Sequence, residues 1–88
     1  MGLSHGEFFR TLPSAMGDTP YRVEGGAVVA DTGRGRSLRI ELGPEGRRRI
    51  ALLSVPVTEV RLSFEGYAPA EMEAFMTYFL SRYQRGGG

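Results

Sequence analysis

Apolar residues recur at helical spacing near the start of the chain. Phe8, Phe9 and Leu12 follow His5 at spacings of three and four, which is typical of one face of a short amphipathic helix. Ser4, with Glu7 three residues later, is a typical N-terminal cap. We therefore predict a helix over residues 4–12 that ends at Pro13, because proline usually terminates a helical pattern.

A second helical pattern begins at Pro69. Its apolar face is formed by Met72, Phe75, Met76, Phe79 and Tyr83, all at spacings of three and four. Acidic residues lie in its first turn and arginines in its last, which complements the helix dipole. We predict a helix over residues 69–85, followed by a glycine tail over residues 86–88.

The middle of the chain alternates between apolar and polar residues and predicts strands. Gly25 and Gly26 separate two extended runs and are typical of a two-residue hairpin turn. This turn would oppose Val23 to Val28 and Tyr21 to Ala30 on one face, leaving Arg22 and Val29 on the other.

The segment Gly43 to Gly46 predicts a second hairpin. Pro44 and Glu45 suit a type I turn, with Gly46 at a positive φ. The resulting register opposes Leu42 to Arg48, Ile40 to Ile50, Leu38 to Leu52 and Glu41 to Arg49. After it, residues 54–57 around Pro56 predict a bend, and residues 59–65 predict a half-buried strand that ends before Gly66.

These elements predict an α+β fold with two layers. An antiparallel meander of four or five strands would carry the C-terminal amphipathic helix on one face, with a short N-terminal helix beside it. We expect one domain over residues 1–88, with a helix and loop in 1–20 and the sheet in 21–66. The expected core is Tyr21, Val23, Val28, Leu38, Ile40, Ile50, Leu52, Val60, Leu62, Phe64, Met72, Phe75, Met76 and Phe79.

Composition narrows the function classes. The 88 residues contain no cysteine, which excludes disulfides and thiolate chemistry. The formal net charge of +1 is far from the basic balance typical of nucleic-acid binding. The longest apolar run, Ile50 to Leu53, is much too short to span a membrane. We therefore expect a cytoplasmic protein without a membrane partner.

All eleven basic residues are arginine, and some lie near the predicted hairpin ends. Arg34, Arg36, Arg47 and Arg49 are candidates for an anion site. The alternative is a solvated strand start, because consecutive strand residues point to opposite faces. The predicted open face holds Arg22, Val29, Arg39, Glu41, Arg49, Ala51, Arg61, Ser63 and Glu65. Without aromatic residues to stack on bases, this face favours cross-strand ion pairs over nucleic acid.

No set of residues predicts catalysis or a metal site. His5 is the one histidine, and we interpret it as a solvated helix residue. Glu71 and Glu73 are two apart on a helix and therefore do not face each other. We expect no metal and no cofactor.

The chain ends in Gly86, Gly87 and Gly88. This ending is similar to that of ubiquitin-like sulfur carriers, whose terminal Gly-Gly is activated at its carboxylate. The resemblance implies an activated carboxylate on Gly88. It covers only the final residues, and a helix rather than a strand precedes them here. A helix C-cap with a frayed tail is the alternative.

Taken together, these patterns predict a small non-catalytic binding or protein-interaction module that forms a homodimer. The candidate interface is apolar surface that no predicted helix covers, at Val29, Ala51, Leu53 and Tyr78. An enzyme is the rival class, and the sequence leaves open whether a small molecule binds.

Overall fold

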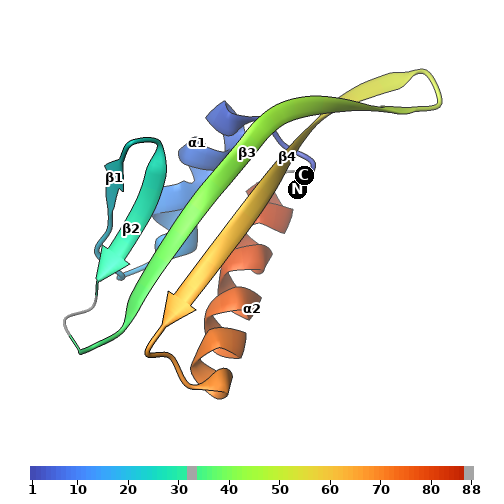
Figure 1. The fold of residues 1–88 in the computed structure, drawn as a ribbon. Helices are drawn as coiled ribbons and strands as arrows, with labels where there is room; N and C mark the ends of the chain where they lie inside the picture. Colours follow the sequence, from blue (N-terminus) through green and yellow to red (C-terminus); the bar gives the residue numbers. More distant parts are fainter. Residues whose placement is uncertain (32–33, 87–88) are drawn as a thin grey trace.

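The structure, a computed structural model, describes residues 1–31 and 34–86, which form two helices and one four-stranded antiparallel sheet. The elements are α1 (His5–Met16), β1 (Arg22–Glu24), β2 (Ala27–Asp31), β3 (Ser37–Ile50), β4 (Leu53–Glu65) and α2 (Pro69–Gly86). Each strand pairs with its chain neighbour in the order β1-β2-β3-β4, and both helices lie on one face of the sheet (Figure 1). The predicted α+β class is confirmed.

Helix α1 begins where the sequence predicts and ends later. The Ser4 hydroxyl accepts from the Glu7 amide at 3.1 Å, and the Glu7 carboxylate accepts from the Ser4 amide at 3.0 Å. The predicted end at Pro13 is wrong, because the helix continues through it to Met16. Proline removes one backbone hydrogen bond, whereas the extra turn buries Ala15 and Met16 in the core.

The β1–β2 hairpin confirms the glycine turn. Gly25 and Gly26 have φ values of 56° and 81°, as a primed two-residue turn requires. Val23 pairs with Val28, and Arg22 pairs with Val29. The ladder begins at Arg22, so the predicted pair between Tyr21 and Ala30 is absent from it. Val23 is 52% exposed rather than buried, since β1 is a three-residue edge strand.

The predicted second hairpin is wrong. Strand β3 runs straight through residues 43–46, and the chain turns instead at Ala51 and Leu52. The observed register opposes Leu38 to Phe64, Ile40 to Leu62, Glu41 to Arg61 and Leu42 to Val60, so none of the predicted pairs across this hairpin forms. Gly46 has no positive φ.

Packing explains why the later turn is used. Pairing with the alternating run of β4 places Leu38, Ile40 and Leu42 opposite Phe64, Leu62 and Val60, whereas a turn at residues 44–46 would place Leu42 opposite Arg48. Gly43 and Pro44 together take the place of one residue in the ladder, which makes a β-bulge between Leu42 and Glu45. The predicted bend at residues 54–57 is also absent, and Pro56 lies within β4 opposite Arg47.

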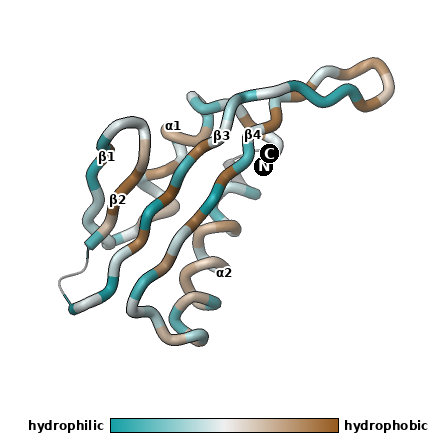
Figure 2. The backbone as a smooth tube through the Cα atoms, in the orientation of Figure 1, coloured by the Kyte–Doolittle hydropathy of each residue, from teal (hydrophilic) through white to brown (hydrophobic). Residues whose placement is uncertain are grey.

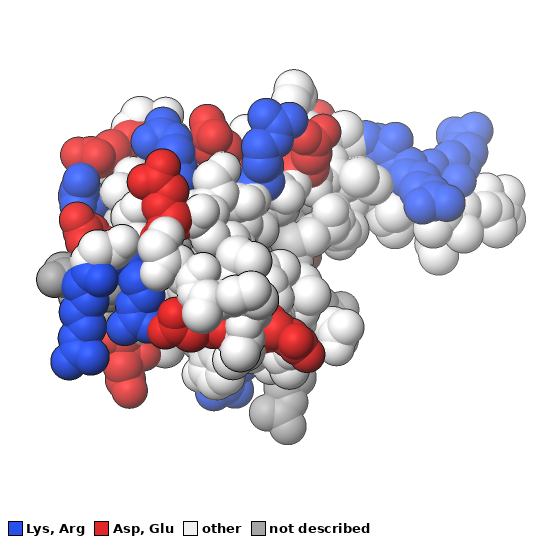
Figure 3. All heavy atoms as spheres, turned by 60° about the horizontal axis from the view of Figure 1, so that its bottom comes forward, with Lys and Arg blue, Asp and Glu red and all other residues white. Residues whose placement is uncertain are grey.

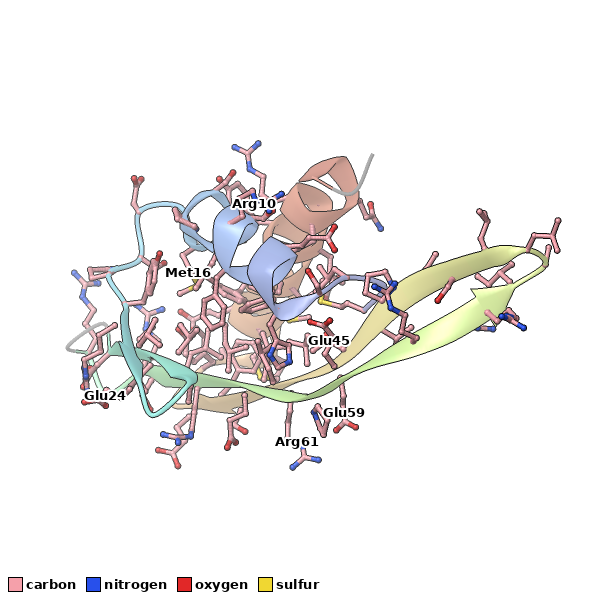
Figure 4. The ribbon with its side chains drawn as sticks, turned by 90° about the horizontal axis from the view of Figure 1, so that it is seen from above. Arg10, Met16, Glu24, Glu45, Glu59 and Arg61 are labelled. Carbon is pink, nitrogen blue, oxygen red and sulfur yellow. The ribbon has the colours of Figure 1, made fainter. Side chains whose placement is uncertain are left out.

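The core lies between the helices and the sheet (Figure 4). It is formed by Phe8, Leu12, Ala15, Met16, Val28, Ala30, Leu38, Ile40, Phe79 and Tyr83. The rings of Phe8 and Tyr83 stack at 5.2 Å, and the Tyr83 hydroxyl donates to the Phe8 carbonyl at 2.9 Å. Burial raises the pKa of Tyr83, which keeps its hydroxyl protonated as a donor. Ile50 and Leu52, predicted for this core, lie outside it.

The last part of the β3–β4 hairpin leaves the rest of the fold. Strand β2 pairs with β3 as far as Ile40, so further along β3 has only β4 as its partner in the described sheet. The two strands project well beyond the helices (Figure 1), and the molecule measures 48 × 26 × 19 Å. We call residues 46–57 the arm and the other described residues the body.

Candidate interaction site on the β3–β4 arm

The root of the arm, where Glu45 pairs with Thr58, is fixed by the N-terminal segment. Thr58 is fully buried, and its hydroxyl donates to the Leu3 carbonyl at 2.8 Å. Its amide donates to the Met1 carbonyl at 2.8 Å, and the Met1 amino group donates back at 2.6 Å. The sequence analysis missed Thr58, although this residue continues the alternation of Val60, Leu62 and Phe64 backwards by one step.

The start of helix α1 contacts the β3 side of the root. The His5 ring nitrogen Nε2 lies 2.8 Å from the Gly43 carbonyl, and the His5 amide donates to the Glu45 carboxylate at 2.9 Å. Figure 4 shows Glu45 on the helix side of the sheet, whereas Glu59 and Arg61 point away from it. The interpretation of His5 as a solvated residue is therefore wrong, because its half-buried ring contacts the bulge.

The tip of the arm exposes large apolar side chains to solvent. Ile50 is 52% exposed, Leu53 is 67% exposed and Leu52 is fully exposed. Figure 2 shows this hydrophobic tip at the far end of the arm, separated from the core. A two-residue loop of Ala51 and Leu52 closes the hairpin, and Ala51 has a φ of 55°. The left-handed region is costly for a residue with a β-carbon, so this turn carries local strain.

The two faces of the arm differ in chemistry. The register opposes Arg47 to Pro56 and Arg49 to Ser54, and these four side chains share one face because cross-strand partners point the same way. The other face holds Arg48, Ile50, Leu53, Val55 and Val57. One face is therefore basic and polar, and the other is mostly apolar.

Charge separates the arm from the body as well. The arm holds three arginines and no acidic residue, so its formal charge is +3. The rest of the chain then holds eight arginines and ten acids, a formal charge of −2. In Figure 3 the arm shows blue and white, whereas red side chains lie over the body.

The four candidate anion-binding arginines do not form one site. Arg34 and Arg36 lie before the start of β3, at the opposite end of this strand from Arg47 and Arg49. Arg36 pairs with Glu71 of α2, and its guanidinium lies 5.8 Å from the centre of the Tyr67 ring. The Arg47 guanidinium donates to the Ser54 carbonyl at 3.3 Å, which links the two strands of the arm.

The candidate interface residues are also divided. Ala51 and Leu53 lie together at the tip of the arm. Val29 lies half-buried on β2, and Tyr78 lies on the outer side of α2 against Arg82, with 5.1 Å from the guanidinium carbon to the ring centre. The sequence analysis left out Ile50 and Leu52. The sequence feature that indicates their exposure is the unbroken apolar run of residues 50–53, because a strand with one buried face would alternate apolar and polar residues.

Ion pairs do form on the open face of the sheet, but within strands. Arg22 pairs with Glu24 at 3.0 Å, Arg39 with Glu41 at 3.7 Å and Arg61 with Glu59 at 3.1 Å. The predicted cross-strand pair of Glu41 and Arg49 is wrong, because the two residues are eight positions apart on the same strand. Exposed pairs of this kind stabilise a fold by at most about 1 kcal/mol each.

A groove of about 320 Å³ lies between α1 and α2. It is lined by Met1, Gly2, Leu3, Glu7, Thr11, Leu80, Tyr83 and Gln84. Glu7 is its one carboxylate, and hydrogen bonds with Ser4 hold the pKa of Glu7 below its ordinary value. Tyr83 also lines this groove, and its hydroxyl already donates to the Phe8 carbonyl.

Within residues 1–31 and 34–86, no group of three His, Asp or Glu residues could hold a metal ion. Gly87 and Gly88, on which the sulfur-carrier resemblance rests, lie outside the described residues, and α2 runs up to Gly86. Neither described helix is long and apolar enough to cross a membrane. No family model, curated protein or solved structure matches the chain.

Proposed function

We propose that the protein is a small non-catalytic interaction module, that the arm is its contact element and that it acts as a homodimer. The observation that carries this proposal is the tip, where Ile50, Leu52 and Leu53 expose apolar surface at the end of a projecting hairpin. Soluble monomers rarely concentrate large apolar residues at an exposed point, and such patches usually mark a protein contact.

The shape of the arm supports this function. An isolated two-stranded hairpin is marginally stable in water. The arm is kept extended by its fixed root at Thr58 and Glu45. An extended arm exposes apolar surface to water and leaves its strand edges unpaired, and both are unfavourable. A partner that covers the arm would remove both costs.

The test uses two neighbouring residues on opposite faces of the arm. Leu53→Asp places a charge on the apolar face, and Ser54→Asp places the same charge on the basic face. Size-exclusion chromatography with light scattering should show a dimer for the natural chain and for Ser54→Asp, and a monomer for Leu53→Asp. A natural chain that stays monomeric at high concentration would remove the homodimer.

A second candidate function is binding of a polyanion through the basic face. The argument from the sequence against nucleic acid assumed that the arginines alternate with acids on one sheet face, whereas Arg47, Arg48 and Arg49 share the arm with no acid. A two-stranded ribbon can enter a nucleic-acid groove, where arginine contacts phosphates. The two arginines of the basic face, Arg47 and Arg49, predict a slope of about −2 for log affinity against log salt.

Fluorescence anisotropy with a short DNA duplex tests this second candidate. The double variant Arg47→Ala and Arg49→Ala should reduce the salt slope by about two. Arg22→Ala, which removes a paired arginine of the body, serves as the control. Binding that does not respond to the arm variant would contradict this candidate.

The sulfur-carrier alternative stays a proposal with its own test. If the carboxylate of Gly88 is activated, intact mass spectrometry of protein from its native cells should reveal a thiocarboxylate or an adduct at the C-terminus. Detection of the unmodified chain alone would argue against it. The cytoplasmic location also stays a prediction.

A further inference from the structure

The groove between α1 and α2 has the chemistry to receive the tip of an arm. Leu80, 40% exposed, lies on its α2 side, and Leu3 borders it near the start of α1. Tyr83 forms an apolar floor, since its hydroxyl is turned to the Phe8 carbonyl. The groove, with a volume of about 320 Å³, offers space for apolar side chains such as the leucines of the tip.

Charge favours the same match. The arm has a formal charge of +3 against −2 for the rest of the chain, so an arm is attracted to the body of another copy. Glu7 is the acidic residue that lines the groove. Its hydrogen bonds with Ser4 hold its carboxylate in the ionised form at neutral pH. Arg48 shares the apolar face of the arm with Ile50 and Leu53, where it can face this carboxylate.

The positions of groove and tip on one chain require a second copy. The groove adjoins the root of the arm, because Met1 and Leu3 line it and bond to Thr58. The tip lies five residues beyond the root, a distance of about 17 Å along an extended strand. The paired strands prevent the tip from folding back. A two-fold axis midway between groove and tip would place each tip on the groove of the other copy, and every contact would form twice.

We infer that two copies exchange arms, so that Leu52 and Leu53 of each arm enter the groove between α1 and α2 of the other copy and Arg48 faces Glu7. This inference rests on the proposed function and names its partner surface. It specifies the acceptor, which the exposed tip alone does not.

The absence of cysteine from the chain makes a direct test simple. Leu52→Cys labels the tip and Gln84→Cys labels the rim of the groove, while Ser63→Cys labels the open face of the sheet as the control. The tip variant is mixed with each of the other two in a thiol–disulfide buffer. Isotope labelling of one chain lets mass spectrometry distinguish the mixed disulfide from each symmetric one.

The expected result is a mixed disulfide between tip and groove in about tenfold excess over that between tip and open face, because docking raises the local concentration of the two thiols. If the natural chain dimerises but the tip links equally to both positions, the groove is overturned as acceptor and the proposed function stands. A natural chain that remains a monomer without any such excess overturns both.

Two other occupants of the tip are tested alongside. A monomeric chain whose tip variants lose co-sedimentation with phosphatidylcholine–phosphatidylglycerol vesicles would identify a lipid surface, and this would overturn the exchange of arms. A monomer that binds a DNA duplex through Arg48 would overturn it as well.

Discussion

The body and the arm contain similar apolar residues but use them differently. In the body, Ile40 and Leu38 of β3 are buried under the helices. In the arm, Ile50 of the same strand is half exposed, although it is also paired with β4. Both residues pair with β4, but Ile40 also pairs with β2 and lies under the helices, whereas Ile50 has neither of these neighbours. The apolar residues of β3 are buried only where the helices lie over them.

The two regions are also held together by different interactions. The body is stabilised by aromatic and aliphatic packing between two layers, and the arm by its backbone ladder and its fixed root. Substitutions of apolar residues should therefore affect global stability in the body and association in the arm. The following substitutions test this difference, beginning with the largest expected effect.

Phe79→Ala should reduce the free energy of unfolding by about 3–5 kcal/mol, because it leaves a cavity in the body. Phe79 is fully buried and its ring lies 4.8 Å from that of Tyr83 and 5.5 Å from that of Phe75. Leu52→Ala, at the fully exposed tip, should change the free energy of unfolding of the monomer by less than about 0.5 kcal/mol. Urea denaturation followed by circular dichroism measures both. Similar losses for the two variants would contradict the distinction.

Gly66→Ala should destabilise the body by at least about 2 kcal/mol. Gly66 has a φ of 76°, and an added β-carbon would lie 2.0 Å from the Gly35 carbonyl oxygen. The matched variant is Gly46→Ala in the arm, whose new β-carbon would lie 3.9 Å from the Val57 carbonyl oxygen at an ordinary φ. It should cost less than about 0.5 kcal/mol. Thermal unfolding compares the two variants. A larger loss of stability from Gly46→Ala would indicate that Gly46 needs a positive φ, as the predicted turn at residues 43–46 requires.

Ala51→Gly should stabilise the arm by up to about 1 kcal/mol, because it relieves the positive φ of 55° at the tip. The gain should appear as slower hydrogen exchange of the arm amides, with the exchange of body amides unchanged. Ala70→Gly in the first turn of α2 is the control and should have the opposite sign, since glycine weakens a helix. Faster exchange in the arm of Ala51→Gly would place the turn elsewhere.

Acid should weaken the body slightly through the Glu7 carboxylate. The pKa of Glu7 is lowered in the folded chain, chiefly by the hydrogen bond from the Ser4 amide and then by the bond with its side chain. The stability that the ionised Glu7 carboxylate contributes is therefore present above the ordinary pKa of a glutamate and is lost as the pH falls through the lowered pKa. Melting temperatures across the acid range should fall less steeply for Glu7→Gln.

Local signals in the sequence predicted the elements that local interactions decide. The capping pair of Ser4 and Glu7, the glycine turn at Gly25 and Gly26, and the helix starting at Pro69 all depend on residues a few positions apart. Ala51 and Leu53 are exposed, and their role in an interface stays a prediction. The arm that carries them was not predicted, because its existence depends on where β2 and the helices end.

The sequence by itself determined the α+β class, the positions of both helix starts, and the three arginines that adjoin an apolar run without any acid between residues 46 and 57. Tertiary structure decided the register of β3 on β4, the passage of α1 through Pro13, and the exposure of Ile50 and Leu52. A turn at Gly43–Gly46 satisfies local preferences. The observed pairing prevails because it sets Leu38 and Ile40 against Phe64 and Leu62 beneath the helices, a gain that only distant residues can supply.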